Sequence, residues 1–273
     1  MKKIDLSQNM TLINGDSEIV IPTLEDNYFD LCITSPPYNV DLGNNKYNKN
    51  PYDLYNDNKD HQEYITWLTS IFCKIYGKMI DGGRVCINVG DGRQGAVPTH
   101  SDIIQFMTKE IGFIPITTIV WNKNQVGNRT AWGSYNSPSN PSFPTPFEFI
   151  MVFSKKSRSL QREGLTDLED REFINYSLSL WNIAPERDMK KIGHPAVFPV
   201  EIPRRLMKML SWKKSKVLDP FNGAGSTAVA CYETGRKYVG VELSEKYCEI
   251  TKNRIKNTRP LRELDIFAGE MYE

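Results

Sequence analysis

Apolar residues in this chain alternate between short unbroken runs, typical of buried strands, and longer segments with helical spacing. Residues 29–34 form a mostly apolar run that ends at two prolines, which cannot continue a central strand. Residues 61–79 instead repeat apolar side chains three and four positions apart, which predicts a helix with one buried face. Further strands are predicted at 84–89, 116–121, 147–153, 216–219 and 238–243, and further helices at 102–110, 203–210, 227–235 and 245–257.

This alternation predicts an α/β fold with a doubly wound, mostly parallel sheet. Two stretches interrupt it. Residues 122–146 are rich in Asn, Ser, Pro and Gly, which indicates a functional loop, and residues 154–192 are polar and resemble a small insert. We therefore expect one domain in three parts: residues 1–121, a variable region at 122–192, and residues 193–273, of which 259–273 form a tail or a packed extension.

Composition excludes several classes of protein. The chain has 273 residues, 40% of them hydrophobic and 25% charged, so it can bury a large core and extensive disorder is excluded. No apolar run approaches the ~18 residues of a membrane span. The first residues, M-K-K-I-D, lack the apolar stretch of a secretory signal, which favours the cytoplasm. The five cysteines form no C-x-x-C pair and the three histidines lie far apart, so no metal site is expected.

Charge is unevenly distributed although the net charge is only +1. Residues 121–162 contain six basic side chains and a single acid, Glu148. Such a region fits a polyanionic partner at one face, but an ordinary charged surface has the same composition. Charge alone leaves both interpretations open.

A glycine-rich turn, D-P-F-N-G-A-G-S-T, occupies residues 219–227 between a predicted strand and a predicted helix. Gly223 and Gly225 allow the backbone to approach a ligand closely at the N-terminus of the helix. Glu242 ends the next strand, where a carboxylate can accept hydrogen bonds from both hydroxyls of a ribose. The turn lacks the G-K-[ST] of a phosphate-binding loop and the third glycine of a dinucleotide site. Together these features predict a nucleoside-type cofactor.

A second motif, S-P-P-Y, follows the first predicted strand at residues 35–38. The two prolines fix the backbone, so the Ser35 hydroxyl and the Pro36 carbonyl become directed acceptors, and Tyr38 supplies an aromatic face. Two acceptors beside a ring suit an exocyclic amino group of a base. A proline-rich turn that merely ends a strand is the alternative for this motif taken alone.

Taken together, these motifs resemble those of the S-adenosylmethionine-dependent amino DNA methyltransferases. Residues 35–38 match their catalytic [SDN]-P-P-[YFW] motif, and residues 219–227 match their D-P-F-x-G-x-G-x-T cofactor loop. H-P-A-x-F-P at 194–199 and G-D at 15–16 match two further segments of the family. The order, with the catalytic motif first and the cofactor loop last, is that of the permuted β class.

The resemblance implies a Rossmann-like methyltransferase sheet with a small target-recognition insert. It also implies site-specific methylation of an exocyclic amine, on a base flipped out of double-stranded DNA. Ser35 favours N4 of cytosine, and N6 of adenine is the alternative. Methylation at carbon 5 of cytosine is excluded, because no cysteine follows a proline. A role in restriction-modification, with a cognate endonuclease as a candidate partner, and a monomeric or homodimeric state are expected.

The resemblance also implies roles for individual residues. The catalytic set is Ser35, Pro36, Pro37 and Tyr38. The cofactor-binding set is Asp16, His194, Phe198, Asp219, Phe221, Asn222, Gly223, Gly225, Thr227 and Glu242. From the charge pattern we add the DNA-binding candidates Lys123, Arg129, Lys155, Lys156 and Arg158.

Three other functions compete with this one. A glutamine-methylating protein methyltransferase also has a P-P-Y loop, but after an Asn and behind the cofactor loop. A catalytically silent DNA-binding module of the same fold would not require the intact Ser35, Tyr38 and Glu242. In a nucleotide-dependent dehydrogenase the S-P-P-Y motif would have no role.

Overall fold

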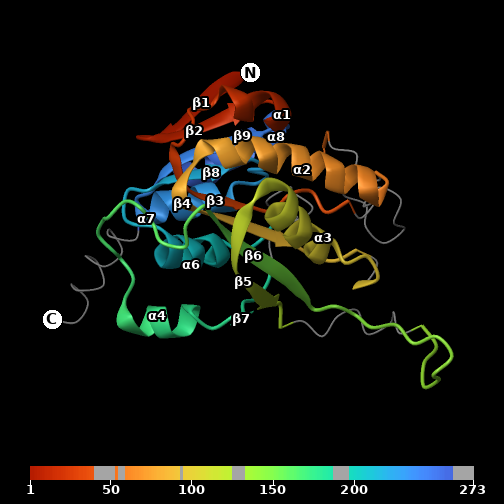
Figure 1. Ribbon diagram of the computed structural model, residues 1–273. Helices are drawn as coiled ribbons and strands as arrows, with labels where there is room; N and C mark the ends of the chain where they lie inside the picture. The colour runs from red at the N-terminus through yellow and green to blue at the C-terminus, as the bar shows by residue number, and fades with distance from the viewer. Residues whose placement is uncertain (40–52, 55–58, 93–94, 125–132, 187–196, 261–273) are drawn as a thin grey trace.

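The protein, described here from a computed structural model, folds around one nine-stranded sheet with helices on both faces (Figure 1). The structure describes residues 1–39, 53–54, 59–92, 95–124, 133–186 and 197–260. The strands within these residues are β1 (Lys2–Ser7), β2 (Met10–Asn14), β3 (Phe29–Thr34), β4 (Met79–Val89), β5 (Phe113–Asn122), β6 (Phe147–Lys155), β7 (Leu180–Asn182), β8 (Lys216–Asp219) and β9 (Lys237–Glu242).

The strand order is β1-β2-β9-β8-β3-β4-β6-β5-β7. The five central strands, from β2 to β4, run parallel, and β1 and β6 run antiparallel to their neighbours. The chain moves outward from β3 in one direction and from β8 in the other. A topological switch point therefore lies between these two strands, and open α/β sheets bind their ligands at such points. The predicted fold class is confirmed.

Two helical layers enclose the sheet. One core lies between the sheet and the helices α1, α2 and α3, and a second core lies between the sheet and α6, α7 and α8. The helices are α1 (Ser17–Val20), α2 (His61–Lys78), α3 (Thr99–Gln105), α4 (Asp170–Tyr176), α6 (Glu201–Leu210), α7 (Ser226–Thr234) and α8 (Glu245–Lys256), with a 3-10 turn η1 (Ile21–Thr23) and a π-helical turn η3 (Phe106–Ile111). Within the described residues, no helix has the length and apolar character needed to cross a bilayer.

Strand β3 shows why a continuous apolar run marks a central strand. Leu31 and Ile33 face one core and Cys32 faces the other, because successive side chains of a strand point to opposite faces. All six residues of β3 are buried. A strand covered on both faces gains from apolar side chains at every position, as the sequence predicted.

The N-terminal hairpin was not predicted. Strand β2 pairs in parallel with β9, and β1 covers the outer edge of β2 in antiparallel pairing. Met10, Leu12 and Ile13 of β2 are buried, so apolar positions were present in the sequence. The run is short, with polar residues at Thr11 and Asn14, and its pairing with a strand more than two hundred residues away fixes it in place.

Strand β4 begins earlier than predicted. The Asp81-Gly82-Gly83 segment was expected to separate a helix from a strand, yet it lies inside β4 as a bulge, where the pairing with β3 shifts register. Gly82 has a φ of +77°, and a Cβ on it would lie 2.2 Å from the Ser159 carbonyl oxygen. Glycine therefore permits the bulge without ending the strand.

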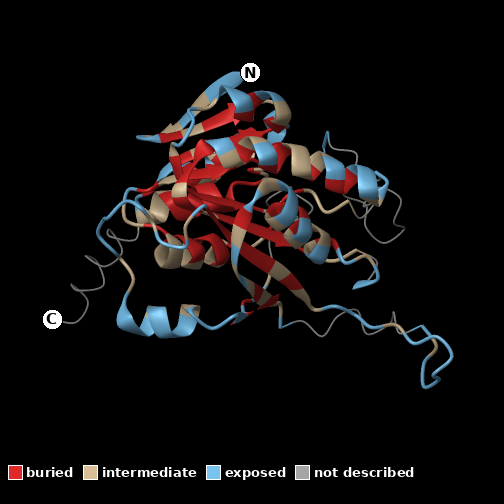
Figure 2. Ribbon diagram, in the orientation of Figure 1, coloured by how far each residue is buried: buried red, intermediate tan, exposed pale blue. Residues whose placement is uncertain are grey.

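The predicted variable region, residues 122–192, contributes strands β6 and β7 to the sheet and is therefore not a separate insert. Strand β6 lies inside the sheet between β4 and β5, and β7 extends the far edge beside β5. Residues 133–146, drawn in lime green, extend away from the helical layers and are largely exposed (Figures 1 and 2). Helix α4 and strand β7 were not predicted within the polar stretch 154–192.

Candidate active site

The two motifs singled out in the sequence meet at the switch point of the sheet. Residues 35–38 follow β3, and residues 220–225 follow β8, its direct neighbour. Thr34 Oγ1 donates to Asp219 Oδ1 at 2.8 Å, which joins the ends of these strands, and burial raises the pKa of Asp219 to about 6. The motifs line one cavity of about 310 Å³, a size within the usual range of about 300–1,000 Å³ for small-molecule sites.

Glu242 lines the half of the cavity formed by the glycine-rich loop, which we call the cofactor half after its predicted ligand. Its carboxylate accepts from the Gly223 amide at 2.7 Å and from the Ser244 amide at 2.9 Å. Burial nevertheless raises the pKa of Glu242 to about 7, because the two amide hydrogen bonds only partly offset the loss of water. The loop requires glycine at position 225, because Gly225 has a φ of +81° and a Cβ on it would lie 2.6 Å from Thr251. The arrangement places a buried carboxyl group beside a loop whose backbone can approach a ligand closely.

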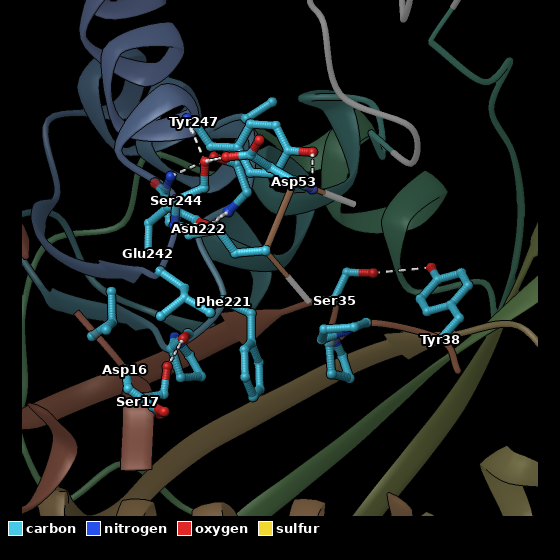
Figure 3. A pocket seen from close by; sticks show the side chains of 18 of the residues that line it. Asp16, Ser17, Ser35, Tyr38, Asp53, Phe221, Asn222, Glu242, Ser244 and Tyr247 are labelled. Carbon is cyan, nitrogen blue, oxygen red and sulfur yellow. Dashed lines mark hydrogen bonds between the residues drawn. The ribbon is translucent and has the colours of Figure 1, made fainter. Parts of the chain in front are cut away.

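Apolar rings form another wall of this half. Phe221 packs against Trp67 of α2 with 5.5 Å between ring centroids, and the Phe221 ring lies between Ser17 and Ser35 in Figure 3. The Ser17 hydroxyl donates to the Pro220 carbonyl and anchors the N-terminus of α1 against the loop. Trp67 was predicted only as part of a helix. Its place in the site follows from how α2 crosses the sheet.

A second contact missed by sequence reasoning lies among the residues that line the cavity. Ser244 Oγ donates to Asp53 Oδ2 at 2.6 Å, and the Asp53 amide donates to the Tyr247 hydroxyl at 3.2 Å (Figure 3). Asp53 is far from α8 in sequence and has no motif around it. No local pattern could have indicated this contact.

The other half of the cavity is formed by residues 35–38, and we call it the catalytic half after its predicted role. Here the Tyr38 hydroxyl takes part in hydrogen bonds. Ser35 Oγ donates to the Tyr38 hydroxyl at 2.9 Å, and that hydroxyl donates to Glu148 Oε2 at 2.7 Å. Tyr64 of α2 donates to the Pro37 carbonyl at 2.7 Å and fixes the loop from the helical side. Sequence reasoning assigned Tyr38 only the role of a stacking surface, and the structure adds a polar role.

The predicted site residues divide by position. All four catalytic candidates line the cavity, and so do six cofactor candidates: Asp16, Phe198, Phe221, Asn222, Gly223 and Glu242. Asp219, Gly225 and Thr227 lie behind the wall and shape the loop. His194 lies outside the described residues. Among the residues that the structure does describe, no group of three or more His, Cys, Asp or Glu side chains could hold a metal ion.

Lys123 is the basic candidate nearest to the catalytic motif. It follows β5 at the same edge of the sheet, and its ammonium lies 2.5 Å from Glu148 Oε1. Its partner is therefore an acid of the site, although its side chain remains 27% exposed. Arg129 lies outside the described residues.

Three other basic candidates are at the wrong edge of the sheet for a common DNA surface with the catalytic motif. Strand β6 runs antiparallel to β4, so its end at Lys155 lies about 27 Å from its beginning near the site. Lys155 is 4% exposed and donates to Asn27 Oδ1 and the Met79 carbonyl. We correct the prediction for this residue: it is a buried structural lysine. Lys156 bonds to Asp81, and Arg158 to the Pro115 carbonyl, at the same distant edge.

Comparison with known proteins agrees with this architecture. A family model described as DNA methylase, of the N6/N4 methyltransferases, matches residues 29–253. Type II methyltransferase M.MjaI of Methanocaldococcus jannaschii is 29% identical, over 93% of this chain and 94% of its own length. M.MjaVI of the same organism is 34% identical over 65% of this chain and 87% of its own length.

Solved structures share the fold. TTHA0409 of Thermus thermophilus, described as a candidate DNA modification methylase, superposes with a TM-score of 0.70 at 25% identity, covering 91% of this chain and 95% of that one. The PvuII DNA methyltransferase, described as cytosine-N4-specific, gives a TM-score of 0.66 at 20% identity, covering 92% and 94%. The family model spans most of the chain, including both motifs and the strands from β3 to β9. The chain therefore belongs to the DNA methylase family of N6/N4 amino DNA methyltransferases.

Proposed function

We propose that this protein methylates the N4 amino group of cytosine at a specific site in double-stranded DNA, with S-adenosylmethionine as the methyl donor. The observation that carries the proposal is the shared cavity. Ser35 and Pro36 line it on one side, and Gly223 and Glu242 line it on the other. An amine acceptor and a nucleoside cofactor would thus meet at one switch point.

The cavity has the chemistry that the cofactor requires. Glu242 offers a carboxylate to ribose hydroxyls, Phe221 and Trp67 offer apolar ring surface, and Gly223 brings backbone close to the ligand. S-adenosylmethionine, when bound, supplies an electrophilic methyl group on a sulfonium. A relative of the same fold, TTHA0409, has been solved in complex with S-adenosylmethionine.

The catalytic half would make the target amine a better nucleophile. An exocyclic amine of a base is nearly planar, because its lone pair is delocalised into the ring. Hydrogen bonds from its two hydrogens to Ser35 Oγ and the Pro36 carbonyl would draw it towards tetrahedral geometry. Holding the amine in line with the methyl group would supply much of the acceleration.

The DNA must reach this cavity with its target base flipped out, at a cost of a few kcal/mol of unstacking. The Tyr38 ring, at the cavity wall, would offer a replacement stacking surface. Residues 122–124 and 133–146 leave the sheet at the edge that carries the site, so they are our candidates for reading the sequence of the DNA. Similar proteins are named type II methyltransferases, so we propose that the activity belongs to a restriction-modification system.

The test is transfer of tritium from labelled S-adenosylmethionine to unmethylated duplex DNA, followed by digestion to nucleosides and mass spectrometry. We expect N4-methylcytosine. N6-methyladenine would keep the mechanism and correct the base. Saturable cofactor binding with no label in any of a broad set of duplexes would overturn the proposed activity and favour a silent DNA-binding module.

A further inference from the structure

Glu148 is a buried acid beside the catalytic loop to which the proposed reaction so far gives no role. It is the second residue of β6, and it is 7% exposed. Its Oε2 accepts from the Tyr38 hydroxyl at 2.7 Å and from Asn88 Nδ2 at 2.8 Å, and its Oε1 pairs with Lys123 at 2.5 Å. Four elements therefore converge on one carboxylate: the loop after β3, β4, β6 and the residue that follows β5.

The chemistry of these groups fixes the direction of the hydrogen bonds. Asn88 Nδ2 donates to the Tyr38 hydroxyl oxygen at 2.7 Å as well as to Glu148. The opposite orientation of the Asn88 amide would set its carbonyl oxygen against the carboxylate, so the amide must present its nitrogen. Tyr38 therefore accepts from Asn88, and its own single proton goes to Glu148.

This direction determines what Ser35 can offer to a substrate. Because the Tyr38 proton is given to Glu148, the phenol oxygen is an acceptor towards Ser35, and the Ser35 hydroxyl donates to it at 2.9 Å (Figure 3). With its proton committed to Tyr38, Ser35 Oγ presents lone pairs elsewhere. Lone pairs are what an amino group requires, since both of its hydrogens are donors.

Lys123 keeps Glu148 in the acceptor state. An ammonium has three donors and no acceptor, so the Glu148 oxygen that it contacts acts as an acceptor. Charge-assisted hydrogen bonds of this kind are shorter and stronger than neutral ones. The pair is partly shielded from water, because the Lys123 side chain is 27% exposed and the Glu148 side chain 9%.

We propose that Glu148 is a positioning residue that acts through Tyr38 to hold the Ser35 hydroxyl as a hydrogen-bond acceptor for the target amine. The proposal rests on the proposed function and adds to it. It gives the Tyr38 hydroxyl a task separate from stacking of its ring. It also gives Lys123 the task of holding Glu148, in place of a phosphate contact.

The substitution Glu148→Gln tests the direction of this chain. Lys123 can only donate, so it would take the carbonyl oxygen of the new amide and leave the amide nitrogen facing Tyr38. Tyr38 would then accept from the amide and turn its proton towards Ser35, which reverses the chain without a change of side-chain shape. We expect the rate of methyl transfer in a single turnover to fall about 100-fold, with the Kd for S-adenosylmethionine unchanged.

A double-mutant cycle separates this role from structural support. In a Ser35→Ala background there is no hydroxyl to orient, so we expect Glu148→Gln to lower the single-turnover rate by less than about 3-fold. The same lack of effect is expected in a Tyr38→Phe background, which keeps the ring and removes the relay. Support that is merely structural would slow transfer equally in all three backgrounds.

Glu172→Gln is the matched control. Glu172 is also a partly buried acid paired with a lysine, since Lys208 Nζ lies 2.6 Å from it, but it lies on α4. We expect this control to transfer methyl groups at the wild-type rate and to melt within a few degrees of the Glu148→Gln variant.

Three results would count against these ideas in different ways. An active wild type with an unaffected Glu148→Gln variant would overturn the positioning role and leave the proposed function intact. Equal losses with and without the Ser35 hydroxyl would overturn the route through Tyr38. A wild type that binds cofactor and methylates no DNA would overturn the proposed function, and the role of Glu148 with it.

Discussion

Glu242 and Glu148 are buried carboxylates at the same edge of one sheet, yet they are held in different ways. Glu242 is stabilised by two backbone amides from its own and the neighbouring loop, and burial raises its pKa to about 7. Glu148 is held by side chains, from a lysine, an amide and a phenol. The first lines the half of the cavity that we propose for the cofactor, and the second lies behind the loop that we propose to hold the target amine.

The difference shows how the two halves are built. Backbone amides depend on the local turn, so the hydrogen bonds that hold Glu242 are encoded within residues 219–244. The catalytic half depends on side chains that meet across the sheet, and Tyr38 and Glu148 are 110 positions apart. We therefore expect substitutions in one half to leave the other half intact. Substitutions of the groups that would hold the reacting amine should lower the rate of methyl transfer the most.

Removal of the catalytic acceptor should have the greatest consequence. Ser35→Ala deletes one of the two acceptors for the amine, and we expect the rate of methyl transfer to fall about 1,000-fold. The Kd for S-adenosylmethionine, measured by calorimetry, should stay at the wild-type value because the residue belongs to the other half. A large loss of cofactor affinity would show that the halves are not separable.

The reciprocal change is Glu242→Ala. It removes a carboxylate that would accept two ribose hydrogen bonds, at about 1.5–3 kcal/mol for a bond to a charged group. We expect the Kd for S-adenosylmethionine to rise at least about 100-fold. Methyl transfer at saturating cofactor should fall far less than in Ser35→Ala. Loss of transfer that saturating cofactor does not restore would contradict this division.

Two neighbouring lysines at the edge distant from the site differ in burial, with Lys155 buried and Lys156 exposed. Lys155→Met would leave Asn27 and the Met79 carbonyl without the buried ammonium that now donates to them. We expect about 2 kcal/mol of lost unfolding free energy, measured with urea, and no change in DNA affinity. Lys156→Met, at an exposed position, should change stability by less than about 0.5 kcal/mol. Weakened DNA binding by Lys155→Met would restore its role as a phosphate contact.

The weakest of these effects concerns pH. The pKa of Glu242 is raised to about 7 in the folded protein, so the folded state binds more protons than the unfolded state at mildly acidic pH. The resulting stability is fully present below the unfolded pKa and is lost as pH rises through about 7. We expect the Tm of the cofactor-free protein to fall by a few degrees between about pH 5 and about pH 8, and to fall less in Glu242→Gln. A Tm that rises over this range would contradict the assignment.

The prediction of the fold succeeded for segments with long or unbroken apolar patterns and failed for the short strands β2 and β7 and for the start of β4. Strand β3 and helix α2 were predicted because their apolar spacing leaves no other packing. The N-terminal hairpin and β7 were missed, because short strands at a sheet edge are defined mainly by their pairing partners. The error at β4 has a different cause, since a positive-φ glycine can serve a bulge as well as a turn.

The sequence by itself determined the cofactor loop, the catalytic loop and their order in the chain, because each is a short segment whose backbone is set by its own prolines and glycines. Only the tertiary structure decided which charged side chains join them. Lys123 and Lys155 lie in the same basic stretch of sequence, but the antiparallel course of β5 and β6 sends one to the site and the other to the opposite edge. Strand direction and register are long-range properties, so no local pattern could separate the two lysines.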